Sequence, residues 1–172
     1  QTLSAALRSP GSALVLLKLP EDANLMPDFA ALRSLYIRVL SLMDQGRIRA
    51  ASVVREGGAA AAVARMAFGN HIGVELAGNL TEQDLFAPCC GSLVLEVDAG
   101  DQDALLSLPG ALLLGNTIEQ PVIRLQNQDL ALDNLIDAWM DTLEKVFPNK
   151  AQGPDEMRDV PLYQERNNFR PA

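Results

Sequence analysis

The sequence of 172 residues contains few of the side chains from which metal and redox sites are built: two cysteines and one histidine. Cys89 and Cys90 are adjacent, and one peptide unit holds their Cα atoms closer together than ordinary disulfide geometry requires. With His71 as the lone histidine, these residues do not supply a zinc site. We therefore expect no metal ligands in this chain and two reduced, half-buried thiols, as is typical of a cytoplasmic protein.

Basic residues and long apolar runs are also scarce. Lys and Arg number 14 against 22 Asp and Glu, so the net charge is −8. This acidic balance argues against a nucleic-acid surface and against attraction to an anionic membrane. The apolar stretch at 11–20 is interrupted by Lys18 and ended by Pro20, which leaves it too short to span a bilayer. We predict a globular protein with neither nucleic acid nor membrane as a partner.

Hydrophobic patterning predicts helices and strands in irregular alternation. Apolar runs bounded by turn residues predict strands at 11–20, 48–54, 71–76 and 91–98 and a strand pair at 111–118 and 121–125. Helical spacing and capping residues predict helices at 29–45, 57–68, 82–86, 102–108 and 129–147. Asp28 is expected to cap the first of these helices, and TEQD at 81–84 is expected to open the third as a capping box. One apolar face of the first helix is expected to consist of Phe29, Leu32, Tyr36, Val39, Leu40 and Met43. The expected fold class is α+β, with a mixed β-sheet packed with helices.

The character of the sequence changes after Pro148. Residues 149–172 are polar, contain several prolines and show no periodicity, as is typical of a linker or an extended arm. We predict a folded domain over residues 1–148 and a linker over residues 149–172.

The stretch SVVREGGAAAAVARMAFGN, residues 52–70, places two glycines where a strand should pass into a helix. The first amides of a helix have no intrahelical partner and carry the positive end of its dipole, so Arg55, Glu56, Gly57 and Gly58 are candidates for binding an anion or substrate phosphate. The spacing matches neither the Walker pattern nor the dinucleotide fingerprint. The alanines that follow favour a second interpretation, in which the small residues let a helix pack closely on a sheet.

Other residues with chemical potential lack the partners that a reaction needs, and no catalytic residue is predicted. His71 has no acid or nucleophile near it in the sequence and is expected at the surface. Asp98, Asp101 and Asp103 do not match a calcium-loop spacing and are expected in a solvated turn. Trp139 is expected in the core or in an interface.

The stretch EGGAAAAVARMAFGNHIGVEL, residues 56–76, resembles the signature EGGLAVALAEMAFGG of the C-terminal domain of the aminoimidazole-ribonucleotide-synthetase superfamily. The variety with MAFGN and IGV is similar to the phosphoribosylformylglycinamidine synthases. PGSALVLLKLP, MPDFAAL, LFAPCCGSLVLEV and LLLGNTIEQPVIRL agree with that family in order. LDNLIDAWMDTLEKVFPNKA resembles the ending of the synthetase part in the long, single-chain form, and VPLYQERNNFRPA resembles the segment that leads into a class I glutaminase domain.

The resemblance implies a fragment of an enzyme that uses ATP, magnesium and glutamine to convert formylglycinamide ribonucleotide into formylglycinamidine ribonucleotide in purine biosynthesis. The chain would be the second C-type domain, and its partners would be the N-type synthetase domains and the glutaminase domain of the same polypeptide. A homodimer of the fragment is a further expectation. The fragment itself is expected to hold no cofactor and to be inactive alone.

The sequence departs from the family at the glycine turn. The superfamily usually reads HDISEGG there, whereas Ser52 and Val53 stand in place of the histidine and the acid, and Arg55 replaces the serine. Two hypotheses follow: a substrate-contacting domain, or a scaffold half whose chemistry is carried by the other copy. An alternative is a stand-alone phosphate-binding or interaction module, related to the selenophosphate or thiamine-phosphate enzymes.

Overall fold

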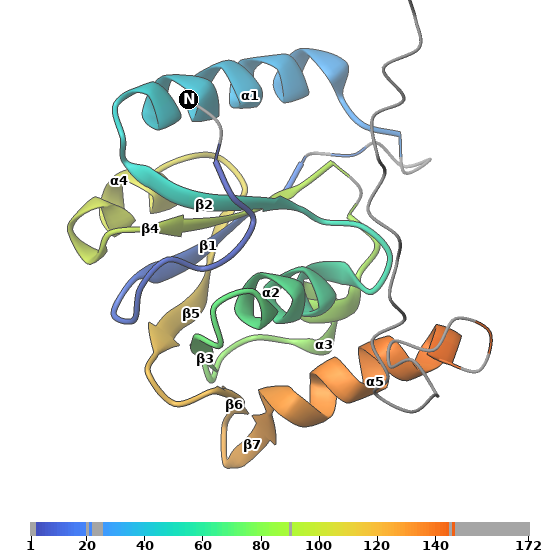
Figure 1. Ribbon diagram of the computed structural model, residues 1–172. Coiled ribbons are helices and arrows are strands. Elements are labelled where there is room, and N and C mark those ends of the chain that lie inside the picture. The colour runs from blue at the N-terminus through green and yellow to red at the C-terminus, as the bar shows by residue number, and fades with distance from the viewer. Residues whose placement is uncertain (1–2, 20, 22–25, 90, 145, 147–172) are drawn as a thin grey trace, which may run out of the picture. The chain divides into compact units, whose positions relative to one another are not determined.

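Seven strands form one mixed sheet in the computed structural model, which describes residues 3–19, 21, 26–89, 91–144 and 146. The sheet order is β2-β4-β1-β5-β3-β6-β7 (Figure 1). The strands are β1 (Ala13–Leu17), β2 (Ile48–Val53), β3 (Gly73–Leu76), β4 (Leu93–Val97), β5 (Ala111–Ile118), β6 (Val122–Leu125) and β7 (Gln128–Ala131). Neighbouring strands are antiparallel except for β3 and β6, which are parallel. The predicted α+β class is confirmed.

Helices cover both faces of the sheet (Figure 1). They are α1 (Phe29–Asp44), α2 (Gly58–Phe68), α3 (Glu82–Phe86), α4 (Gln102–Leu106) and α5 (Leu132–Glu144), with a 3-10 turn at Ala99–Asp101. The sheet residues that alternate toward α2 and α3 form one apolar core, which includes Leu14, Val74 and Leu114. Those that point the other way, such as Val15 and Leu95, pack with α1 and α4 in a second core. Of the helices that the structure describes, none is long and apolar enough to cross a membrane.

Two parts of the predicted strand arrangement are wrong. The strands at 111–118 and 121–125 exist but do not pair, because β3 lies between β5 and β6. The last helix begins at Leu132 and not near Asp129. Residues 128–131 form instead the edge strand β7, which is exposed along its whole length and therefore lacks the apolar alternation that would predict a strand.

The start of α1 is fixed as predicted, and the predicted apolar face of the helix is buried in part. The Asp28 carboxylate accepts hydrogen bonds from the amides of Ala30 and Ala31 and so caps the helix. Phe29 and Leu40 were expected to point inward, yet they are 66% and 56% exposed. Val39 of the predicted face is buried as expected, and Leu42 is buried beside it, so the buried stripe is shifted toward Leu42. The predicted Thr81 capping box of α3 is confirmed.

A buried carboxylate holds the segment that precedes β1. Glu96 on β4 is fully buried, and its two oxygens accept the amide hydrogens of Arg8 (2.8 Å) and Ser9 (3.3 Å). Beside it, the Thr117 hydroxyl accepts the Ser12 amide at 2.8 Å and donates to the Ser9 carbonyl at 2.8 Å. Buried polar groups are costly without partners, so any shift of residues 8–12 would leave some of these groups unpaired. The network therefore fixes the position of this segment relative to β4 and β5.

An ion pair joins the end of β1 to the first turn of α3. The Lys18 ammonium lies 2.5 Å from an Asp84 carboxylate oxygen, and the Thr81 amide and hydroxyl donate to the other oxygen. The hydrogen bond from Lys18, followed by those from Thr81, lowers the pKa of Asp84 from 3.8 to about 2.

Because the folded pKa of Asp84 is depressed, its contribution to stability is present above about pH 4 and is lost as the pH falls toward 2. We expect the free energy of unfolding to fall less steeply over this window in Asp84→Asn than in the wild type. Urea unfolding at a series of pH values measures this slope. Asp103→Asn, an exposed change on α4, serves as the control and should keep the wild-type slope. An unchanged slope in Asp84→Asn would contradict the assignment.

The chain divides into two compact units, residues 1–139 and 140–172, with the boundary inside α5. The predicted domain end at residue 148 and the predicted linker at 149–172 lie outside the described residues and stay predictions.

Candidate functional site

The glycine turn leads from the edge strand β2 into α2, as predicted. Val54 is buried and donates its amide to the Ser92 carbonyl, while Arg55, Glu56 and Gly57 are exposed. Gly57 is the N-cap of α2 with φ +87°. Because glycine has no side chain, it makes no capping hydrogen bond to the first amides of the helix. The two glycines therefore lie, as expected, at the turn from a strand into a helix, and α2 begins at Gly58.

Gly58 is the residue of the turn that packs against the end of α3. It is buried, its φ is +68°, and its amide donates to the Arg55 carbonyl at 3.0 Å. A Cβ at this position would overlap the carbonyl oxygen of Leu85 and lie 2.8 Å from the Cα of Phe86. The last turn of α3 thus packs directly on Gly58. The glycine is required by a close backbone approach, and one of the amides available to an anion is already used inside the turn.

The side chains of the turn make few contacts in the described part of the chain. Arg55 and Glu56 are adjacent, exposed and of opposite charge, and neither side chain makes a hydrogen bond or ion pair there. Val53, which stands in place of the family's acid, is 42% exposed. It lines an apolar groove of about 240 Å³ with Leu40, Leu93 and other apolar residues of α1 and β2. Binding of an anion or substrate at Arg55, Glu56, Gly57 and Gly58 stays a prediction.

The remaining candidate residues lie apart from the turn. His71 is exposed, as predicted, and its Nδ1 is 3.8 Å from a carboxylate oxygen of Asp133, an acid remote in the sequence. Asp98 pairs with Arg49, and Asp101 pairs with Arg47 at 2.6 Å. These ion pairs join the turn to β2. Asp98 keeps 48% of its side chain exposed and Asp103 is exposed, as expected for a solvated turn.

Of the two places expected for Trp139, the core or an interface, the structure rules out the core. It is 56% exposed and packs edge-on against Phe68, with their ring centroids 6.5 Å apart. The Arg65 guanidinium lies 5.6 Å from the Trp139 ring centroid, within the range of a cation–π contact. Cys89 is free and half-buried, and Cys90 lies outside the described residues.

A metal or nucleotide site finds no support in the side chains that the structure places. Within the described ranges, no three His, Cys, Asp or Glu side chains lie close enough to hold a metal ion. The glycine turn lacks the acid that the family resemblance would require there. These residues do not fit a bound magnesium nucleotide, and we derive no chemical step through one.

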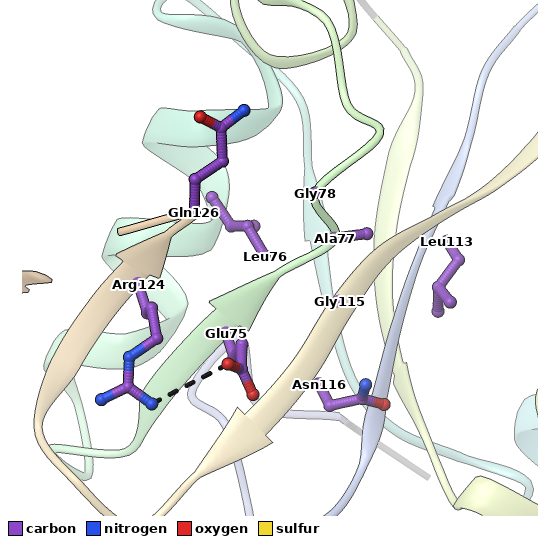
Figure 2. A pocket seen from close by; sticks show the side chains of 9 residues that line it. All are labelled: Glu75, Leu76, Ala77, Gly78, Leu113, Gly115, Asn116, Arg124 and Gln126. Atoms are coloured by element: carbon purple, nitrogen blue, oxygen red, sulfur yellow. Dashed lines mark ion pairs between the residues drawn. The ribbon is translucent and has the colours of Figure 1, made fainter. Parts of the chain in front are cut away.

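A polar hollow of about 370 Å³ lies on the opposite half of the sheet, over β5, β3 and β6 (Figure 2). Val74 and Leu76 point toward α2, so Glu75 between them projects from the other face. In the strand register, Glu75 lies opposite Asn116 on β5 and opposite Arg124 on β6, and Arg124 lies opposite Asp129 on β7. Four polar side chains therefore form one row across four strands. We call it the polar row.

Ion pairs orient the polar row. Arg124 donates to both carboxylate oxygens of Asp129, from Nε at 2.8 Å and from Nη2 at 3.0 Å. Its Nη1 is 3.8 Å from the Glu75 carboxylate, and Figure 2 shows the two groups pointing toward one another. The hydrogen bonds with Asp129 raise the pKa of Arg124, and the same bonds lower the pKa of Asp129. The guanidinium is thus held in place with one nitrogen directed into the hollow.

Gly115 brings the strands under the hollow together. A Cβ at this residue would overlap the carbonyl oxygen of Glu75, so a side chain would separate β5 from β3. The sequence pattern predicts strands at Gly115, Asn116 and Arg124 but indicates no site there. The only signal was the polar residue at alternate positions of each strand, which is equally typical of a solvated sheet face.

Comparison with known proteins relates the chain to PurL. No protein-family model matches it. It is 28% identical over 118 residues to the phosphoribosylformylglycinamidine synthase subunit PurL of Lactobacillus delbrueckii subsp. bulgaricus, over 66% of this chain and 16% of that protein. Thermotoga maritima PurL complexed with ATP has a similar structure, with a TM-score of 0.64 and 14% identity over 77% of this chain and 27% of that one.

Escherichia coli HypE, a hydrogenase maturation protein, shares the fold with a TM-score of 0.57 and 20% identity, over 76% of this chain and 51% of that chain. The predicted resemblance is confirmed at the level of a PurL-related domain with the fold of the aminoimidazole-ribonucleotide-synthetase superfamily. The chain spans only 16% of the length of the curated relatives that it matches.

Proposed function

We propose that the chain is the second C-type domain of a phosphoribosylformylglycinamidine synthase of the long, single-chain form. The sequence relation to PurL and the shared fold support this assignment. The stretch that ends in VFPNKA and the segment VPLYQERNNFRPA, which resembles a linker to a glutaminase, favour the long form. The whole enzyme would be an ATP-dependent ligase of purine biosynthesis that acts as a glutamine amidotransferase.

Within that enzyme the domain has mainly a scaffold role, and the contact at Gly58 carries this proposal. Both glycines of the turn are kept, but the buried one faces the backbone of α3 and no ligand-binding side chain adjoins it. The position of the family's acid holds Val53 at the edge of an apolar groove. Conserving the turn for packing explains these features, since a phosphate site needs the exposed amides and a favourable charge together.

The other parts of the enzyme would supply what this domain lacks. T. maritima PurL has been obtained in complex with ATP, with ADP and with formylglycinamide ribonucleotide (FGAR). In the proposed enzyme, ATP and magnesium would bind to the N-type synthetase domains, and ammonia would come from the glutaminase domain of the same cytoplasmic polypeptide. Residues 149–172 would be the linker toward the glutaminase.

Calorimetric titration of the 172-residue chain tests the scaffold role. Inorganic phosphate, magnesium ATP and formylglycinamide ribonucleotide are the probes, and ADP release with ammonia present is the activity measurement. We expect no saturable binding at the turn and no turnover. Binding or turnover that Arg55→Ala abolishes, while Arg33→Ala on α1 leaves it unchanged, would contradict the scaffold role and restore the substrate-site hypothesis.

A further inference from the structure

In the polar row, Nη1 of Arg124 and the Glu75 carboxylate form an ion pair without a direct hydrogen bond between them. Arg124 uses Nε and Nη2 on Asp129, but its Nη1 is 3.8 Å from Glu75, which is longer than a hydrogen bond. Glu75 is 55% exposed and makes no hydrogen bond with another described residue through its carboxylate. A ligand that donates to Glu75 and accepts from Nη1 would satisfy both groups at once.

The charges in the hollow and beside it select among such ligands: Glu75 and Arg124 line the hollow, and Asp129 on β7 lies beside Arg124. Glu75 and Asp129 are anionic and Arg124 is cationic, so the polar row carries a net charge of −1. Asp129 already neutralises much of the guanidinium charge through two hydrogen bonds. A phosphate or another multiply charged anion would be repelled, whereas an ammonium group beside Glu75 would be attracted. This preference is opposite to that of a phosphate site.

The spacing also favours a ligand that carries both charges close together. In an α-amino acid the ammonium and the carboxylate are attached to the same carbon, so they match an acceptor and a donor that are 3.8 Å apart. Asn116 on the other side of Glu75 adds an amide that both donates and accepts (Figure 2). The hollow of about 370 Å³ has room for a small amino acid and its side chain.

We propose that the hollow over β5, β3 and β6 binds a small polar α-amino acid as its zwitterion. The ligand's ammonium donates to the Glu75 carboxylate, and its carboxylate accepts from Nη1 of Arg124. Its side chain lies toward Asn116. The site is separate from the glycine turn, which lies at the far end of the sheet order beside β2, and it does not depend on the proposed scaffold role. Because the hollow is open to solvent, the affinity is modest, with a Kd on the order of 1 mM.

Two-dimensional NMR titration of the 172-residue chain tests this site. L-asparagine and L-serine are the probes, with propionate, ethylamine, glycerol and inorganic phosphate as comparison compounds. We expect saturable shifts at the amides of β3, β5 and β6 with both amino acids. Propionate and ethylamine, which each carry one of the two charged groups, should bind at least about tenfold more weakly, and phosphate should not bind.

Matched variants distinguish the site from weak surface association. Glu75→Gln keeps the shape but removes the charge, and it should weaken amino-acid binding at least about tenfold. Glu119→Gln changes an exposed carboxylate that does not line the hollow, and it should bind as the wild type does. Both changes are at exposed positions, so the melting temperatures should stay equal. Equal binding by Glu75→Gln and the wild type, binding of phosphate or glycerol as tight as that of the amino acids, or no shifts with either amino acid would overturn the proposal.

Discussion

Replacing Glu96 with alanine is expected to lower the free energy of unfolding by about 3–5 kcal/mol, the effect of unpaired buried amides together with a cavity. The fully buried carboxylate accepts the amide hydrogens of Arg8 and Ser9, and alanine leaves both without a partner. Glu96→Gln should cost less, about 1–3 kcal/mol, because the amide oxygen still accepts one of the two hydrogens. Urea unfolding measures all three free energies.

Hydrogen exchange locates the effect of the Glu96 change. The amides of Arg8 and Ser9 should exchange faster in Glu96→Ala than in the wild type, since they lose their acceptor. Glu56→Ala is the control, because that carboxylate is exposed and makes no contact with a described partner. If Glu96→Ala unfolded at the same urea concentration as Glu56→Ala, the carboxylate would not be what holds the segment before β1.

Gly58→Ala is expected to destabilise the chain by about 2–4 kcal/mol and to lower the melting temperature by roughly 5–15 °C. Two causes act together at this residue: a positive φ of +68° and a backbone neighbour that a Cβ would overlap. Because the atoms in contact belong to the backbone of Leu85 and Phe86, a side-chain rotation cannot relieve the overlap. The last turn of α3 must move away from α2.

Gly11→Ala separates the two causes. Gly11 has φ +82°, but a Cβ there would meet nothing within 4 Å, so only the backbone strain of about 1 kcal/mol remains. Differential scanning calorimetry of both variants gives the comparison. Equal melting temperatures for Gly58→Ala and Gly11→Ala would show that the contact between the turn and α3 adds nothing. The scaffold role proposed for the glycine turn would then lose its main support.

The local features of the fold could be predicted from the sequence, because short-range chemistry determines them. The caps at Asp28 and Thr81 are side-chain hydrogen bonds to amides two or three residues away. The apolar runs predicted buried strands correctly because a run of apolar side chains between turn residues is stable only inside the core. β7 could not be predicted, since an exposed edge strand carries no apolar pattern and owes its existence to pairing with β6.

The sites depended on pairings that no local pattern shows. Glu75 meets Asn116 and Arg124 only because β3 lies between β5 and β6, whereas the sequence favoured pairing those two strands directly. In the same way, Gly57 and Gly58 could be recognised as a turn, but the neighbour that makes Gly58 necessary comes from α3. The residues of a site can thus be predicted without the contacts that decide what the site does.

In the described sheet, β6 and β7 are the one pair of adjacent strands that also follow each other directly in the sequence. β1 pairs with β4 and β5, which both come much later in the sequence. Ala13, for example, aligns with Val97 on one side and with Asn116 on the other. Long loops must close before these pairs form, so refolding is expected on the millisecond-to-second scale typical of high contact order. While the ribosome is still making β5, the apolar β1 is without its second neighbour. During that interval the nascent chain exposes an unpaired strand edge, which is a site for aggregation.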